Sequence, residues 1–230
     1  MSAWQSRSQA LALGMSMAAP VTALPDITHV LYLHGFRSSP RSAKATLTHD
    51  WMQRHHPDVT WLCPQLPPSP AEAMAQLLAA TADWPQPHSA VMGSSLGGFY
   101  AAALAARRRQ VDWCARLKPA VDPARDLARY LGEQTFWHAP EECFYFQPAY
   151  IGELQTIDRE TRADEHRRAT EGTLAPACAL ICQGDEVLDW REMAARHARA
   201  ELHVLPGGDH AISDYARHLP QVMDFLGLGA

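Results

Sequence analysis

Residues 90–100 read Ala-Val-Met-Gly-Ser-Ser-Leu-Gly-Gly-Phe-Tyr, and this stretch decides the fold. The apolar run Ala90–Met92 is typical of a short buried strand, and the Ala-rich run Leu96–Arg108 is typical of a helix. Between them, residues 93–97 fit the pattern G-x-S-x-G, which presents a serine on a sharp turn from strand to helix. The two glycines let the backbone pass closely, so Ser95 is expected to stand exposed in a strained conformation. The stretch predicts a nucleophilic serine at the end of a strand, near the positive end of a helix dipole.

Strands and helices alternate along the rest of the chain. Near-continuous apolar runs, typical of strands covered on both faces, predict strands at residues 30–33, 59–62, 90–92, 114–117, 179–182 and 202–205. The stretches between them predict helices at residues 42–56, 71–82, 96–108, 191–200 and 212–226. This alternation predicts an α/β fold with a mostly parallel, doubly wound sheet and helices on both faces.

Length and composition fit one globular domain. The chain has 230 residues, of which 47% are hydrophobic and 20% are charged, a balance that excludes a disordered or fibrous protein. We expect a single domain over residues 26–230, preceded by an N-terminal extension over residues 1–25. The extension carries a weak apolar run, Ala10–Ala19, that loosely resembles a secretion signal. Cytoplasmic location is the expectation, with export as the alternative if that segment is real.

Charge, apolar runs and the spacing of cysteine and histidine residues limit the possible partners, compartment and metal ligands of the protein. The formal net charge of −5 disfavours nucleic acid and anionic membranes as main partners. No apolar run approaches the roughly 20 residues of a membrane-spanning helix. The five cysteines include no C-x-x-C pair, which favours a reducing compartment. His55, His56 and His203 lack the spacing of metal ligands, so no metal is predicted.

A nucleophilic serine needs a base, and the base needs an orienting carboxylate. Asp185 follows the apolar run that ends at Cys182, and His210 follows the one that ends at Leu205. Both residues therefore belong at the carboxyl edge of the sheet, where open α/β sheets build their sites. They also follow Ser95 in the order serine, acid, histidine. Among nearby carboxylates, Asp185 is preferred over Glu186, Asp189 and Asp209 because it comes directly after the glycine at the strand tip.

Backbone N–H groups are expected to bind the negative charge that develops in such a reaction. Leu96, directly after the serine, is one candidate donor. The second is Phe36, in the run His34-Gly35-Phe36 that follows an early strand. Arg37 comes next and is a candidate substrate-binding residue.

The segment 132–172 breaks the alternation of strands and helices. Its first half is rich in aromatic residues and its second half, residues 158–171, is polar. We expect a cap-like insertion over the site, in which Phe144 and Phe146 offer apolar area to an acyl chain. For the polar half, a cap and a merely solvated helix are equally good interpretations.

Several motifs together resemble the YqiA/YcfP-like family of small α/β-hydrolase esterases. They are His34–Pro40 with Ser42 and Lys44, Gly93–Tyr100, Pro119–Val121, Gln183–Asp189 and Gly207–His210, in register over most of residues 30–228. The resemblance implies the α/β-hydrolase fold and an esterase acting on acyl esters or acyl thioesters, with Ser95, Asp185 and His210 as its triad. The sequence departs from the family at Lys118 and Asp122, where relatives are expected to carry Asn and Arg.

The residues predict a serine esterase or thioesterase that takes a small-molecule acyl substrate and needs no cofactor. Two alternatives stay open. One is a non-catalytic binding protein on the same scaffold, because fold does not fix function. The other is a hydrolase that uses the same three residues on amide or carbon–carbon bonds.

Overall fold

A six-stranded parallel sheet forms the centre of the molecule in the computed structural model, which describes residues 26–85, 88–108 and 113–230. The strand order is β2-β1-β3-β4-β7-β8. The strands are β1 (His29–Leu33), β2 (Thr60–Leu62), β3 (Ser89–Ser94), β4 (Trp113–Leu117), β7 (Ala177–Cys182) and β8 (Glu201–Leu205). The predicted strands are all present, and the predicted α/β-hydrolase fold is confirmed.

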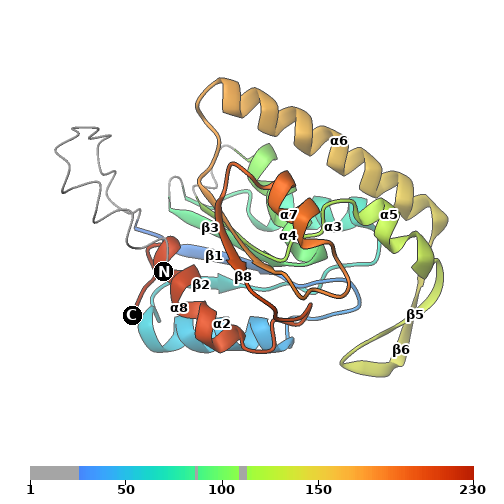
Figure 1. Ribbon diagram of the computed structural model, residues 1–230, viewed down its shortest axis with the longest axis horizontal. Coiled ribbons are helices and arrows are strands. Elements are labelled where there is room, and N and C mark those ends of the chain that lie inside the picture. Colours follow the sequence, from blue (N-terminus) through green and yellow to red (C-terminus); the bar gives the residue numbers. More distant parts are fainter. Residues whose placement is uncertain (1–25, 86–87, 109–112) are drawn as a thin grey trace.

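Helices cover both faces of the sheet (Figure 1). One face carries α2 (Ala43–His55) and α8 (Tyr215–Phe225). The other carries α3 (Pro70–Ala80), α4 (Leu96–Arg107), α5 (Pro123–Leu127), α6 (Pro148–Thr170) and α7 (Trp190–Arg196). Alternate residues of each strand point to opposite faces. In β1, Leu31 and Leu33 accordingly pack under α4, whereas Val30 and Tyr32 pack against α2 and α8.

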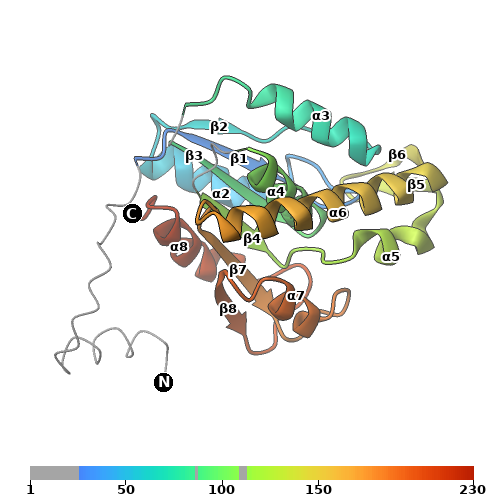
Figure 2. The same cartoon turned by 90° about the horizontal axis from the view of Figure 1, so that it is seen from above.

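The insertion at residues 132–172 consists of a β-hairpin and a long helix. A two-stranded hairpin, β5 (Gly132–Phe136) and β6 (Ala139–Phe146), projects at one end of the sheet (Figure 1). A short 3-10 helix, η1 (Ala128–Tyr130), leads into it from α5. The rest of the insertion is the 23-residue helix α6, which crosses α4 (Figure 2) and also packs against α3 and α5.

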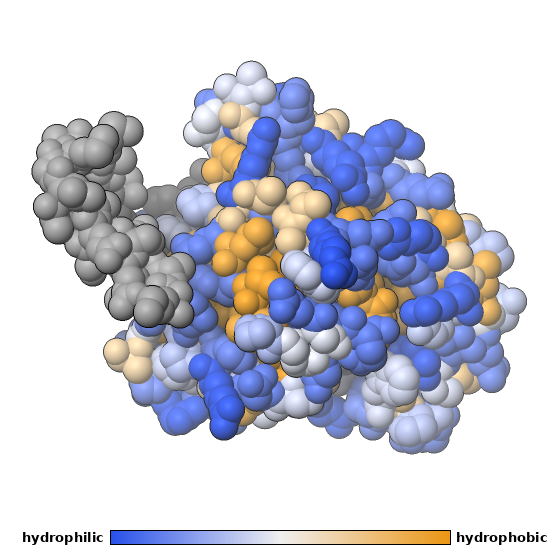
Figure 3. Space-filling model, viewed as in Figure 1, coloured by the Kyte–Doolittle hydropathy of each residue, from blue (hydrophilic) through white to orange (hydrophobic). Residues whose placement is uncertain are grey.

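Helix α6 is packed against the body of the protein and is not solvated on all sides. Its outward surface is mainly hydrophilic (Figure 3), but Leu154, Ile157, Thr161 and Arg168 are buried. Their spacing of three, four and seven residues puts them on one face of the helix. This stripe is narrow and half polar, so hydropathy alone does not reveal it.

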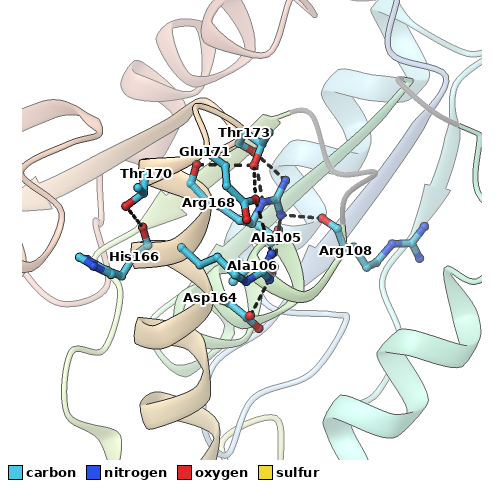
Figure 4. A network of polar contacts seen from close by, with 10 residues as sticks. Ala105, Ala106, Arg108, Asp164, His166, Arg168, Thr170, Glu171 and Thr173 are labelled. Carbon is cyan, nitrogen blue, oxygen red and sulfur yellow. Dashed lines mark hydrogen bonds and ion pairs between the residues drawn. The ribbon is translucent and has the colours of Figure 1, made fainter.

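Arg168 holds the end of α6 against the end of α4 (Figure 4). Its guanidinium donates hydrogen bonds to the carbonyl oxygens of Ala105, Ala106 and Arg108 and to that of Thr173. The last carbonyls of a helix have no partner within the helix, so this buried arginine satisfies the C-terminus of α4. The contact fixes the C-terminal half of α6 on the body of the protein.

The predicted N-terminal extension lies outside the described residues. In the part of the chain that the structure describes, no helix is long and apolar enough to cross a membrane. The five cysteines are all free thiols.

Candidate active site

Ser95 stands on a strained turn between β3 and α4. Its φ and ψ angles are 56° and −119°, in the left-handed region that side chains rarely adopt. The backbone is crowded here: a methyl group on Gly93 would lie 2.1 Å from the carbonyl oxygen of Gly97, and one on Gly97 would lie 2.0 Å from that of Leu33. Glycine is therefore required at both positions, which explains the G-x-S-x-G pattern.

His210 connects Ser95 to Asp185. Its Nε2 lies 3.2 Å from the Ser95 Oγ. Its Nδ1 lies 3.0 and 2.9 Å from the two carboxylate oxygens of Asp185. An ionised carboxylate only accepts hydrogen bonds, so Nδ1 carries the proton of a neutral ring and Nε2 offers its lone pair to the serine hydroxyl.

Asp185 is held as a carboxylate below the histidine. Its side chain has no exposed surface, and its Oδ1 accepts hydrogen bonds from the backbone N–H groups of Val187 (2.9 Å) and Leu188 (2.8 Å). Burial acts to raise the pKa of Asp185, but the hydrogen bonds from His210, Leu188 and Val187 bring that pKa below its ordinary value. Asp185 is therefore a carboxylate at neutral pH.

The other carboxylates near the site have different partners. Asp209 bonds the Ser213 hydroxyl and backbone N–H, and Asp189 caps α7 by accepting from the Arg191 N–H. Glu186, which the sequence reasoning did not assign a role, accepts the backbone N–H of His210 at 2.9 Å. It therefore fixes the loop that carries the histidine.

Two backbone N–H groups beside Ser95 are free to bind an anion. Leu96 is the first residue of α4, and its N–H forms no hydrogen bond to another described residue; the same holds for Phe36. The loop after β1 passes directly against the serine, since a methyl group on Gly35 would lie 3.4 Å from the Ser95 Cβ. These are the two amides that the sequence predicted.

His34 holds this loop in place. Its buried ring accepts the Leu66 N–H at Nε2 (3.1 Å), and its Nδ1 lies 3.0 Å from the Gly35 carbonyl oxygen. Burial lowers the pKa of His34 to about 4, so the ring is neutral at pH 7 and makes one bond as acceptor and one as donor.

Arg37 joins the same loop to the hairpin. Its Nε donates to the Thr135 carbonyl oxygen (2.6 Å) and its Nη2 to the Thr135 hydroxyl (3.0 Å). Its guanidinium also lies 4.1 Å from the centre of the Trp137 ring, within range of a cation–π interaction. Arg37 therefore lines the cavity at Ser95 and also bonds the hairpin through two of its guanidinium N–H donors.

A cavity of about 140 Å³ opens at Ser95 and His210. Its apolar wall includes Leu127, Tyr130, Trp137 and Leu188. Phe144 and Phe146, which the sequence reasoning selected as substrate-binding residues, lie outside this cavity. Phe146 is 1% exposed. Both rings pack edge-on against Phe36, with centroid distances of 5.1 Å for Phe146 and 5.9 Å for Phe144.

The sequence model of the uncharacterised protein family UPF0227 matches residues 29–227. The chain belongs to this family. The match spans the domain from β1 to the end of α8, and it confirms the resemblance to the YqiA/YcfP-like proteins that the motifs indicated.

This UPF0227 chain is also similar in structure to several solved α/β hydrolases. Est1E from Butyrivibrio proteoclasticus with ferulic acid bound aligns with a TM-score of 0.67 at 15% identity, over 88% of this chain and 89% of that one. The structure reported for the metagenome-derived lipolytic enzymes LipS and LipT gives a TM-score of 0.65 at 18% identity, over 88% and 94%. The mouse alpha/beta hydrolase domain-containing protein 10 gives 0.60 at 15% identity, over 85% and 89%. At these identities the likeness establishes the shared fold.

Tyr130 and Trp137 line the cavity at Ser95, and the sequence reasoning did not single them out. Trp137 is 70% exposed although it is a large apolar side chain, and Tyr130 comes from η1, just before the insertion. The aromatic richness of this region is visible in the sequence, but which rings face the serine depends on how the hairpin packs. Among the described residues, no group of three or more His, Cys, Asp or Glu is arranged to hold a metal ion.

Proposed function

We propose that the protein is a serine hydrolase that cleaves carboxylic acyl esters through an acyl-enzyme intermediate. The observation that carries this proposal is the unbroken hydrogen-bonded chain from the Ser95 Oγ through His210 to the buried Asp185 carboxylate. That chain ends at an apolar cavity, and two unpaired backbone N–H groups flank the serine. These are the parts that acyl transfer requires.

In the first half-reaction, the Ser95 Oγ attacks the ester carbonyl carbon while His210 Nε2 takes the hydroxyl proton. The carbonyl oxygen becomes an oxyanion and accepts hydrogen bonds from the Leu96 and Phe36 N–H groups. Asp185 stabilises the imidazolium without taking its proton. When the intermediate collapses, the bond to the alcohol breaks and His210 gives the proton to the leaving oxygen.

In the second half-reaction, His210 removes a proton from water, whose oxygen attacks the acyl-Ser95 carbonyl. Collapse of this second intermediate releases the carboxylic acid and returns the proton to the Ser95 oxygen. No metal or organic cofactor takes part in these steps. Because a thioester presents the same carbonyl carbon, acyl thioesters are included in the proposed substrate class.

The shape of the cavity supports a small or medium acyl group. Its volume of about 140 Å³ and its tyrosine and tryptophan suit a short aliphatic or a planar aromatic acyl group better than a long chain. The similarity to Est1E with ferulic acid bound suggests that aromatic acids belong on any substrate panel.

The proposal is tested with p-nitrophenyl esters of increasing chain length, a feruloyl ester and acyl-CoA thioesters, each assayed on wild type and Ser95→Ala. We expect hydrolysis of short esters by the wild type and none above background by the variant. A fluorophosphonate probe should label the wild type on Ser95. Absence of both turnover and labelling would indicate a binding protein on a hydrolase scaffold. Turnover that survives Ser95→Ala would contradict the proposed mechanism.

A further inference from the structure

A second cavity, of about 290 Å³, lies away from Ser95. Its walls come from the C-terminal half of α6, from α7 and the turn that follows it, and from the start of β7. Figure 2 shows α6 and α7 on the same side of the sheet. No described residue that lines this cavity also lines the cavity at Ser95.

Positive charge is concentrated around this second cavity. Among the described residues that line it, Arg116, Arg162, Arg196 and Arg199 carry guanidinium groups, and Glu165 carries the one carboxylate. The protein as a whole has a net charge of −5, so this local balance runs against the overall composition. Arginine is the side chain best suited to bind phosphate and carboxylate groups, because its planar guanidinium offers two parallel N–H donors.

The acidic residues nearby compensate only part of this charge. Glu165 is shared between Arg196 (2.6 Å) and the buried Arg116 (3.7 Å). Arg162 pairs with Asp158, one turn earlier on α6. Arg199 makes no hydrogen bond or ion pair to another described residue. Counting Asp158 and Glu165 against the four arginines leaves a net charge of +2 around the cavity.

A buried histidine in the same wall has a donor without a partner in the part of the chain that the structure describes. His197 is 4% exposed, and its Nδ1 lies 2.8 Å from the Arg116 Nη1. A guanidinium only donates hydrogen bonds, so Nδ1 accepts and Nε2 carries the proton of the neutral ring. Burial, followed by the nearby arginines, lowers the pKa of His197 to about 2, which keeps the ring neutral. Its Nε2 is buried and has no hydrogen-bond partner among the described residues. Buried donors normally have a hydrogen-bond partner.

We propose that this second cavity binds a small molecule that carries a phosphate group. A phosphate monoester has a charge of about −1.5 to −2 at pH 7, which matches the net charge of +2 around the cavity. Its oxygens accept hydrogen bonds from guanidinium groups. Besides His166, the remaining wall consists of apolar residues such as Leu174, Ala175 and Ala198, which leaves room for an organic portion. This site is independent of the proposed hydrolysis at Ser95.

Binding is measured by isothermal titration calorimetry at constant ionic strength, with ribose 5-phosphate and inorganic phosphate as probes. Ribose, sulfate and citrate serve as comparison ligands. We expect saturable binding of ribose 5-phosphate at one site per chain, weaker binding of phosphate alone, and none of ribose. Equal binding of citrate or sulfate would overturn the assignment to phosphate, and absence of saturable binding would overturn the site.

Three variants locate the binding. Arg199→Gln and Arg162→Gln should each weaken ribose 5-phosphate binding by about tenfold, the loss expected for one charge-assisted hydrogen bond. Arg159→Gln removes the same charge from an exposed position on α6 that does not line the cavity, so it should leave the affinity within about twofold. Equal losses in all three variants would mean that the ligand responds to general charge, and the proposal would fail. Ester hydrolysis is measured in parallel and is expected to be unchanged, since none of the three residues lines the cavity at Ser95.

Discussion

The Arg37 guanidinium lies 4.1 Å from the centre of the Trp137 ring, and the Trp137 backbone N–H donates a 2.9 Å hydrogen bond to the Arg37 carbonyl oxygen. Arg37 adopts a left-handed backbone conformation, with φ at 58°. These two contacts join the loop that carries the Phe36 amide to the β5–β6 hairpin. The hairpin therefore affects both the shape of the cavity at Ser95 and the position of one proposed oxyanion donor.

Trp137→Ala should change substrate selection more than the chemical step. The ring forms part of the cavity wall at Ser95, and each buried CH₂ of an acyl chain is worth about 0.8 kcal/mol. We expect the preference for longer or aromatic esters over acetate to fall by about tenfold, mainly through KM, with kcat on p-nitrophenyl acetate nearly unchanged. Tyr145→Ala is the matched control, because Tyr145 belongs to the same hairpin, is 62% exposed and does not line this cavity. Equal losses on every ester would instead mean that Trp137 acts by positioning the loop that carries the Phe36 amide.

Phe146→Ala should act on stability. Its ring is 1% exposed and contacts Phe36 and Tyr150, and removal of a core phenylalanine costs about 3–5 kcal/mol. Urea unfolding should show a large drop in the free energy of unfolding. Tyr145→Ala, on the opposite face of the same strand and 62% exposed, should leave stability almost unchanged. If Phe146→Ala were as stable as wild type and changed only chain-length preference, the ring would belong to the substrate pocket.

Asp185→Asn should lose activity by several orders of magnitude, because the amide no longer holds His210 in the tautomer that accepts the serine proton; the equivalent change in a serine protease costs about 10⁴ in kcat. Asp209→Asn and Asp189→Asn should lose far less, since those side chains bond Ser213 and the start of α7. The comparison is made as kcat/KM for the three variants on one short ester. A larger loss in either control than in Asp185→Asn would identify that control residue as the carboxylate that orients His210.

The features that the sequence predicted correctly depend on interactions between residues close together in the chain and on the general geometry of parallel sheets. The strand–turn–helix at Ser95 depends on short-range sterics at Gly93 and Gly97. Asp185 and His210 each follow a strand, and the ends of parallel strands meet at one edge of the sheet. Long-range packing decides the features that were missed. Phe144 and Phe146 alternate with Tyr145 along β6, and nothing within the hairpin says which face turns toward Phe36. The role of Glu186 depends on the His210 N–H, 24 residues away.

Lys118 should make the stability of the protein depend on pH. This lysine is 3% exposed and adopts a positive φ of 41° at the end of β4. Burial first, and then repulsion by Lys44, lower the pKa of Lys118 to about 7, against the partial compensation of Asp185 and Glu186. In the unfolded chain a lysine has a pKa of about 10.4.

The unfolded state therefore binds more protons than the native state between about pH 7 and pH 10, and stability rises with pH across that window. Below about pH 7 both states are protonated, and the native state carries the full cost of a buried charge. Lys118→Met removes this cost, so the variant should melt at a higher temperature than wild type at pH 6.5. The gain should be at least about 2–4 °C, the shift that corresponds to 1 kcal/mol in a domain of this size. The difference between the two proteins should shrink steadily as the pH rises to about 10. Melting curves recorded by circular dichroism at half-unit pH intervals measure it, and a difference that stays constant with pH would mean that the lysine is not a buried charge in the native protein.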